Sequence, residues 1–207
     1  MIQPPGTDGV AFSDRSDGDM RDDPASRERL SNGLRIPSEW ATVSQVHRSD
    51  VIEVAEPGNA GAADALWTRV SGLPLAVFTA DCLGVVLIAD AGVGVAHAGW
   101  RGVDAGVVAR LREEMGSAGS HPVRAYVGPG IGPCCFEVGP EVAERFPGAI
   151  SRTTWGTQSV DLAAALGDQL AGVTLYTMAA CTMHEDAWYS HRQDGTPARL
   201  ATLGWIR

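Results

Sequence analysis

Residues 73–98 read LPLAVFTADCLGVVLIADAGVGVAHA, and this stretch indicates the fold class more clearly than any other. It contains three short apolar runs, 73–79, 84–89 and 93–98, which have the length and composition of buried strands. The triplet Asp90-Ala91-Gly92 separates the last two runs and predicts a tight turn between them. We therefore expect three buried strands here, two of them joined as a hairpin.

Both helices and strands are expected further along the chain. Residues 103–115 carry apolar side chains at helical spacing, and Gly116 follows as a natural helix stop. We expect a short helix that opens at Pro140 and another that Asp161 caps. The first of these helices is expected to end at residue 146 and the second at residue 170. Strands are predicted for residues 123–127 and 173–178.

The element pattern predicts a single compact domain. The strands outnumber those of a simple alternating βα chain, so the expected class is α+β, with layered mixed β-sheets flanked by helices. Residues 1–35 are polar and rich in Asp, Arg, Ser and Gly, which predicts a loop-rich N-terminal arm. One catalytic domain is then expected over residues 36–207.

Composition narrows the functional classes. The chain has 207 residues, of which 44% are hydrophobic and 20% charged, as in ordinary globular proteins. The net charge of -9 argues against binding to nucleic acid or to anionic membranes, because such binding needs clustered cations. A small anionic substrate is still compatible with this charge, since it needs only a few local arginines.

The sequence also indicates a compartment. The N-terminus lacks the basic start and apolar core of a secretory signal, and the apolar residues 83–100 are interrupted by Asp90 and His97. The spacing of the four cysteines (82, 134, 135 and 181) is not that of a disulfide framework. We therefore expect a reducing, cytoplasmic setting.

Three residues stand out as candidates for chemistry. His47 lies in SQVHRSDV, Cys82 in TADCLG between two apolar strands, and His97 in GVAHAGWRG at the end of a strand. One cysteine and two histidines can hold zinc with an open fourth position, and they equally suit a cysteine nucleophile activated by histidine. Each residue alone is also compatible with an inert core position. Asp64, in ADALWT, could orient a histidine, cap a turn or face water.

Other segments are candidates for binding anions. HAGWRG opens a helix, whose N-terminal N–H groups attract anions, and Arg101 lies beside them. WYSHRQDGTPAR places His191 and Arg192 in a glycine-containing loop. Both segments could instead be solvated surface. The rigid run GPGIGPCC presents Cys134 and Cys135, which could also be buried thiols in a turn.

Taken together, the motifs resemble one family. SQVH at 44–47, ADALWT at 63–68, TADC at 79–82, HAGWRG at 97–102, GPGIGPCCFEVG at 128–139 and SHRQDG at 190–195 occur in the order found in the laccase-domain family. These proteins were long called polyphenol oxidases and are now described as purine nucleoside phosphorylases. The resemblance covers residues 10–207, nearly the whole chain.

The resemblance implies a compact, usually monomeric α/β fold with a metal site. The site falls on His47, Cys82 and His97 and would hold Zn²⁺, or alternatively Cu²⁺. The implied activity is phosphorolysis of adenosine, inosine, guanosine and methylthioadenosine to the base and ribose 1-phosphate, with adenosine deamination beside it. The partners are thus a purine nucleoside and phosphate, without nucleic acid or membrane.

The resemblance also suggests roles for individual residues. The expected catalytic residues are His47, Cys82, His97 and Arg101. The expected phosphate ligands are four residues: Arg15 in FSDR, Arg101, His191 and Arg192. The chain departs from the family pattern in its short N-terminal segment, at Trp67, Gln193 and Pro197, and in lacking a cysteine soon after CT at 181–182.

Three alternatives remain open. A cysteine hydrolase or amidase that edits peptidoglycan precursors would use Cys82 as nucleophile and His97 as base. Copper-dependent phenol oxidation fits less well, because five histidines cannot supply several His-rich copper sites. A metal-binding partner protein of the cell-wall machinery would turn over no nucleoside.

Overall fold

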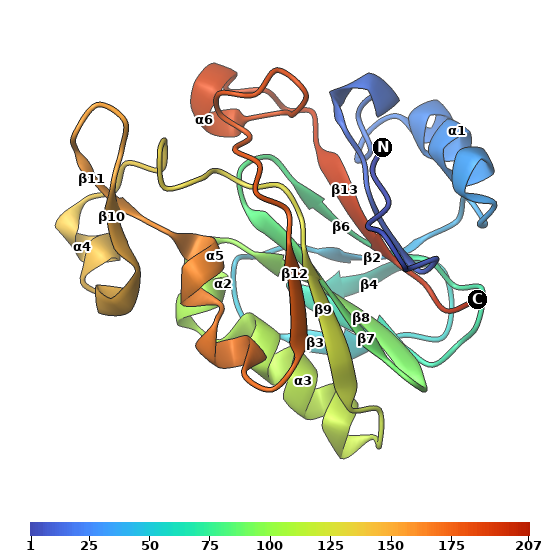
Figure 1. Ribbon diagram of the computed structural model, residues 1–207. Helices are drawn as coiled ribbons and strands as arrows, with labels where there is room; N and C mark the ends of the chain where they lie inside the picture. The colour runs from blue at the N-terminus through green and yellow to red at the C-terminus, as the bar shows by residue number, and fades with distance from the viewer.

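Two packed β-sheets with helices outside them form the body of the protein (Figure 1). A computed structural model describes residues 1–207. The first sheet has five strands in the order β1-β13-β6-β2-β4, and the second has six in the order β12-β9-β7-β8-β5-β3. Each sheet contains parallel and antiparallel pairs. The predicted fold class, layered mixed sheets flanked by helices, is confirmed.

The elements have the following bounds. The strands are β1 (Val10–Phe12), β2 (Ala41–Ser44), β3 (Val51–Glu53), β4 (Gly58–Ala62), β5 (Ala65–Thr68), β6 (Leu75–Thr79), β7 (Leu83–Ala89), β8 (Gly92–Ala98), β9 (Pro122–Val127), β10 (Ile150–Arg152), β11 (Gln158–Val160), β12 (Thr174–Thr177) and β13 (Leu200–Gly204). The α-helices are α1 (Pro24–Leu34), α2 (Trp100–Asp104), α3 (Val107–Ser117), α4 (Pro140–Ala143), α5 (Leu162–Ala165) and α6 (His191–Asp194). Three short 3₁₀ turns occupy Arg15–Asp17, Pro147–Ala149 and Asp168–Leu170.

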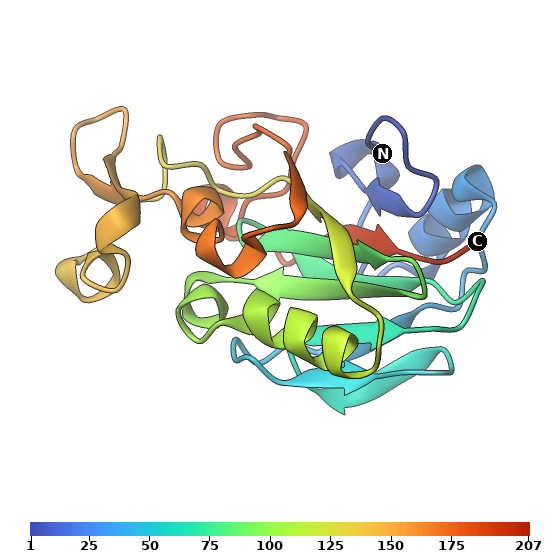
Figure 2. The same cartoon turned by 60° about the horizontal axis from the view of Figure 1, so that its bottom comes forward.

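The layers explain why the central strands are continuous apolar runs. Between the sheets lies a core that includes Val77 and Val86, and α3 covers the opposite face of the six-stranded sheet with Val108 and Leu111. α1 covers the outer face of the five-stranded sheet with Leu30 and other apolar residues. Strands β7 and β8 therefore bury both faces and have no polar side to alternate with. Figure 2 shows α3 packed against one face of the second sheet.

The predicted hairpin and the five predicted strands occur where expected, whereas the helices are shorter than predicted. β7 and β8 pair in register from Leu83↔Ala98 to Ala89↔Gly92. The helix expected over 103–115 is two helices, because Gly106 adopts a left-handed φ of 77° between α2 and α3. Asp161 does cap a helix, through the N–H of Ala164, but α5 ends at Ala165 and only a 3₁₀ turn follows.

Residues 1–35 contain more regular structure than the predicted loop-rich arm. β1 pairs antiparallel with β13, and α1 begins where the Asp23 side chain accepts a hydrogen bond from Ala25 N–H, with Pro24 at the first helical position. The polar composition misled the prediction because only one side of α1, including Leu30 and Leu34, is buried. The proposed boundary at residue 35 stays a prediction.

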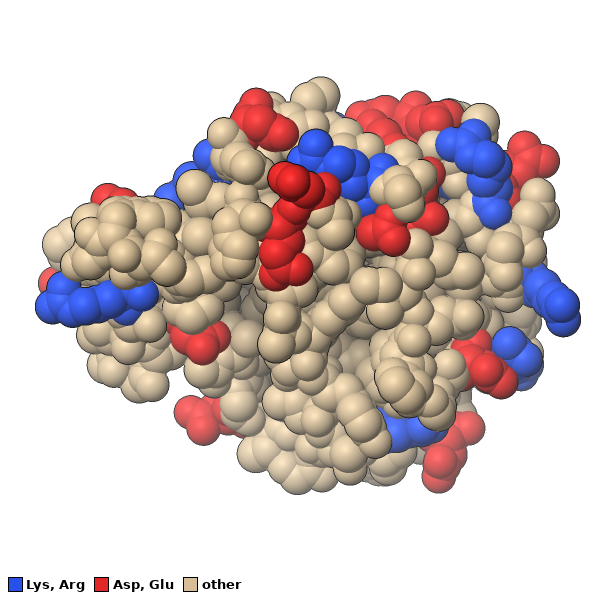
Figure 3. Space-filling model, turned by 45° about the horizontal axis from the view of Figure 1, so that its top comes forward, with Lys and Arg blue, Asp and Glu red and all other residues tan.

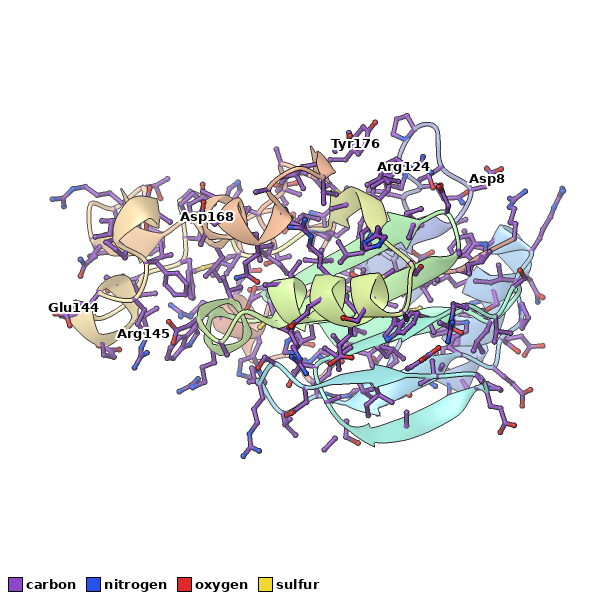
Figure 4. All side chains as sticks on the ribbon, turned by 90° about the horizontal axis from the view of Figure 1, so that it is seen from below. Asp8, Arg124, Glu144, Arg145, Asp168 and Tyr176 are labelled. Carbon is purple, nitrogen blue, oxygen red and sulfur yellow. The ribbon has the colours of Figure 1, made fainter.

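One segment projects from the layered body. α4 and the β10–β11 hairpin extend to one side of both sheets in Figures 1 and 2. Figure 4 shows Glu144 and Arg145 on this projection, far from Tyr176 and Arg124 on the sheet. None of the helices combines the length and the apolar composition needed to cross a membrane.

Candidate active site and metal centre

Both sheets contribute to the candidate site. His47 follows β2 in the five-stranded sheet, His97 belongs to β8 in the six-stranded sheet, and Cys82 lies in the crossover from β6 to β7. The three predicted residues meet: their candidate ligand atoms all lie within 4.8 Å of one another. The two imidazole rings stand edge to face, with centroids 4.8 Å apart.

A single buried carboxylate orients both histidines. Asp64 is fully buried, and its Oδ1 lies 2.8 Å from Nδ1 of His97. Its Oδ2 accepts hydrogen bonds from the backbone N–H groups of Val46, at 3.1 Å, and Arg48, at 2.6 Å, on either side of His47. Of the three roles considered for Asp64, orientation of a histidine is the one observed. Since Nδ1 of His97 is engaged, Nε2 is the nitrogen that faces Cys82.

The trio carries paired charges. Burial disfavours both ionised forms, but hydrogen bonds from His47 and His97 and their charges lower the pKa of Cys82 to about 6. Burial likewise opposes charge on His97, yet its bonds to Asp64 and Cys82 raise its pKa to about 9. At neutral pH in the metal-free protein, the site is therefore a thiolate beside an imidazolium, flanked by the Asp64 carboxylate.

The backbone is constrained around these residues. His47 and Asp81 both have left-handed φ values, 60° and 88°, which are uncommon for residues other than glycine. The Asp81 side chain is held by the hydroxyl of Thr182 and by the backbone N–H of Arg192, each at 2.7 Å. At Gly99 a Cβ would lie 2.9 Å from the Cys82 sulfur, so only glycine leaves room for it. Such strain commonly marks functional sites.

The trio opens into the largest of the described cavities, of about 770 Å³. This volume lies in the range of small-molecule sites. Its lining is more polar than apolar and includes Gln45, Asn59 and the rings of Trp40 and Phe78. The guanidinium of Arg27 lies over both rings, 5.9 and 5.3 Å from their centroids.

Three arginines to which the sequence analysis assigned no role also line this cavity: Arg21, Arg27 and Arg199, the last of which lies in the WYSHRQDGTPAR loop with His191. Carbonyl oxygens of Thr196 and Ala198 both accept from Nη1 of Arg199, which leaves Nε and Nη2 for a ligand. Burial and then the positive charge of Arg21 lower the pKa of Arg199. Arg21 and Arg27 belong to the polar segment 1–35, and no motif marked them.

The predicted phosphate ligands are not gathered in one place. His191 lines the cavity, whereas Arg15, Arg101 and Arg192 are absent from its lining. Arg15 binds the carbonyl of Trp188, Arg101 lies over the ring of Trp100, and Arg192 binds the carbonyl of Glu137. Their predicted roles in binding or catalysis stay predictions. Figure 3 shows acidic and basic side chains interspersed on the face turned forward.

Comparison with known proteins connects this site with a family. The family model described as "Multi-copper polyphenol oxidoreductase laccase" matches residues 8–207. The chain belongs to this family. Among curated relatives, the purine nucleoside phosphorylase ORF3 of Streptomyces griseus is 42% identical over 91% of this chain and 85% of its own length. The purine nucleoside phosphorylase YfiH of Escherichia coli is 35% identical over 87% and 79%.

Solved structures of similar proteins have the same fold as this laccase-family chain. YlmD from Geobacillus stearothermophilus superposes with a TM-score of 0.79 at 27% identity, covering 100% of this chain and 87% of that one. The Bacillus licheniformis hypothetical protein YfiH gives a TM-score of 0.82 at 24% identity, with 99% and 88% covered.

The donor set of the trio fits the metal that the family implies. One thiol with a lowered pKa and two imidazoles, one fixed through a carboxylate, form the arrangement seen at three-ligand metal sites. Sites of two histidines and one cysteine occur with zinc and with copper, so these donors do not choose between them.

Proposed function

We propose that this chain is a purine nucleoside phosphorylase whose substrates are adenosine, inosine, guanosine and methylthioadenosine. The observation that carries the proposal is one cavity lined both by His47, Cys82 and His97 and by arginine side chains suited to phosphate. The relatives named as purine nucleoside phosphorylases support the same activity. Zn²⁺ is the proposed metal and Cu²⁺ the alternative.

The cations of the cavity suit the phosphate. Two arginines, Arg21 and Arg199, come close enough for their charges to repel, and His191 lies in the same lining. A bound phosphate dianion would neutralise this repulsion and accept charge-assisted hydrogen bonds from the free Nε and Nη2 of Arg199. We therefore assign phosphate in this cavity to Arg21 and Arg199 together with His191, which is one of the four ligands predicted from the sequence.

The reaction requires little covalent participation by the protein. A phosphate oxygen forms a bond to C1′ as the bond from C1′ to the base nitrogen breaks. The base leaves with the electron pair and gains the proton that the hydrogen phosphate dianion loses, so the products are the neutral base and ribose 1-phosphate. Holding phosphate and nucleoside in one cavity supplies the necessary proximity. The planar guanidinium of Arg27, which lies over the rings of Trp40 and Phe78 and lines the cavity, offers a surface against which the purine can stack. When bound at the trio, the metal supplies a Lewis acid, the chemistry that the proposed side reaction, adenosine deamination, uses.

The experiment is incubation of the metal-loaded protein with adenosine and phosphate, followed by mass analysis. Adenine and ribose 1-phosphate are expected, and Cys82→Ala should abolish both. Asp90→Asn, an exposed site in the β7–β8 turn, is the matched control and should keep full activity. Inosine as the sole product would mean that the protein deaminates adenosine and does not phosphorolyse it. The absence of both adenine and inosine would refute the proposed function.

A second candidate is the cysteine hydrolase or amidase, which one specific observation favours. Cys82, His97 and Asp64 form a nucleophile–base–carboxylate relay, with the thiol pKa lowered to about 6. Alkylation by iodoacetamide separates the two candidates, because a metal-bound thiolate resists the reagent. Equal alkylation rates with and without metal would favour the hydrolase.

A further inference from the structure

A second cluster of metal-type donors lies outside the active-site trio. We call it the Cys₃His cluster; it consists of Cys134, Cys135, Cys181 and His184, whose candidate ligand atoms all lie within 4.8 Å of one another. Two loops supply it: the turn after β9 contributes the adjacent cysteines, and the turn after β12 contributes Cys181 and, three residues later, His184. None of these residues belongs to the trio of His47, Cys82 and His97.

The distances in the cluster match a tetrahedral zinc site. With Zn–S bonds of about 2.3 Å and a Zn–N bond of about 2.0 Å, tetrahedral geometry places sulfur and nitrogen about 3.5 Å apart. In the structure Nδ1 of His184 lies 3.6 Å from the sulfur of Cys134 and 3.4 Å from that of Cys135. The three sulfur atoms lie within 4.8 Å of one another. Both sulfur–nitrogen distances are therefore those of a tetrahedral zinc site, and the sulfurs lie close enough together to share one ion.

The surroundings hold the donors in place. The backbone N–H of Gly132 donates to the sulfur of Cys181 at 3.2 Å, the kind of outer contact that orients a thiolate ligand. A Cβ at Gly132 would lie 3.2 Å from the sulfur of Cys134 and 3.3 Å from the Cβ of Cys181, so glycine lets the loop close over the thiols. Cys135 and Cys181 are buried, whereas His184 is exposed.

A backbone hydrogen bond joins the two loops independently of the thiols, because Thr182 N–H donates to the carbonyl of Gly130 at 3.0 Å. Within the turn after β12, Cys181 N–H donates to the carboxylate of Glu185 at 2.6 Å. The donor cluster is thus fixed by the fold on both sides. Its spacing does not depend on four independently mobile side chains.

We propose that the Cys₃His cluster binds one Zn²⁺ as a closed structural site. All four tetrahedral positions are filled by protein donors, and three of them are thiols, the ligand set of structural rather than catalytic zinc. The ion fastens the loop after β9 to the turn after β12. Thr182 in this turn holds Asp81, the residue before Cys82, so the zinc also supports one wall of the active site.

Zinc content tests the proposal without reference to nucleoside turnover. The His47→Ala/Cys82→Ala double variant removes two donors of the trio, and it is purified in reducing buffer and analysed by elemental mass spectrometry. One zinc per chain is expected to remain after dialysis. Adding Cys134→Ser and Cys181→Ser should remove that zinc, whereas His121→Ala, at a histidine outside both clusters, should not.

Zinc-edge X-ray absorption of the same double variant tests the ligands directly and does not depend on folding of the quadruple variant. The expected shell is three sulfurs at about 2.3 Å and one nitrogen at about 2.0 Å. His184→Cys should retain the metal and convert the shell to four sulfurs. A double variant without zinc, a shell with fewer than three sulfurs, or a chain lighter by two hydrogens through a disulfide in the cluster would each overturn the proposal.

Discussion

Replacement of Asp64 by asparagine tests the organisation of the site most sharply. The amide has the shape of the carboxylate, and its oxygen can still accept from the N–H groups of Val46 and Arg48. Its NH₂ group then faces Nδ1 of His97, where a carboxylate oxygen now lies at 2.8 Å. His97 must become an acceptor at Nδ1 and carry its proton on Nε2, the nitrogen that faces Cys82. The variant thus keeps the packing but reverses the tautomer.

The magnitudes follow from the charges in the site. The rise in the His97 pKa from 6.5 to about 9 corresponds to about 3 kcal/mol, which Asp64 and Cys82 share. Loss of roughly half of this stabilisation, about 1 to 2 kcal/mol, lowers the Tm by about 2 to 8 °C for a chain of this length. A protonated Nε2 cannot bind metal, so metal affinity and kcat/KM should fall by about 10- to 100-fold.

Calorimetry, metal titration and nucleoside kinetics measure these effects. The control variant is Asp90→Asn, which also replaces one carboxylate by an amide. In metal-free protein the raised pKa of His97 gives stability that is complete below pH 6.5 and lost as the pH rises through about 9. The difference in Tm between parent and Asp64→Asn should therefore be larger at pH 6.5 than at pH 10. Unchanged metal affinity together with unchanged kcat/KM would refute the assignment of Asp64 as the residue that positions His97.

Three further variants or reagents test other parts of the site. Arg199→Met should raise the KM for phosphate by about 10- to 100-fold through loss of charge-assisted hydrogen bonds. Arg152→Met, on the projecting hairpin, is the control. A KM for phosphate that is the same in Arg199→Met as in the parent would contradict the phosphate assignment. In metal-free protein, the rate of alkylation of Cys82 should reach half its maximum near pH 6. The stability that the thiolate gives should be lost as the pH falls through the same value. A midpoint near 8.5, the pKa of a free thiol, would disprove the ion pair between Cys82 and His97. Gly99→Ala places a Cβ 2.9 Å from the Cys82 sulfur and should destabilise the protein by about 1 to 3 kcal/mol and weaken metal binding, whereas Gly148→Ala, with open space around it, should do neither.

The sequence predicted the centre of the fold better than its periphery. Strands β7 and β8 were evident because burial on both faces makes each a continuous apolar run. The break at Gly106 was missed because the apolar spacing of 103–115 continues across it, and only the left-handed backbone of Gly106 reveals two helices. β4, with the sequence GNAGA, has no apolar pattern, because it is a largely exposed strand at the edge of its sheet.

The candidate site was predicted unevenly for a similar reason. His47, Cys82 and His97 lie in distinctive motifs, and the structure brings them together. Arg21 and Arg199 lie far apart in sequence and meet only because β1 pairs with β13 and brings the flanking segments to one cavity. A lone arginine in a polar segment gives no signal of this, so tertiary pairing was needed to find it. The role of His184 depends in the same way on two loops that meet after β9 and β12.

The distribution of the trio over two sheets also sets a limit on when the site can form during synthesis. His47 follows β2, a neighbour of β6, and the other neighbour of β6 is β13, Leu200–Gly204. The sheet that positions His47 is therefore completed only after residue 204 has left the ribosome, although all three candidate metal donors lie within the first 97 residues. The three residues are therefore synthesised long before the fold that brings their side chains together is complete. On the proposed function, tight metal uptake at the trio would accordingly mark a molecule that has finished folding.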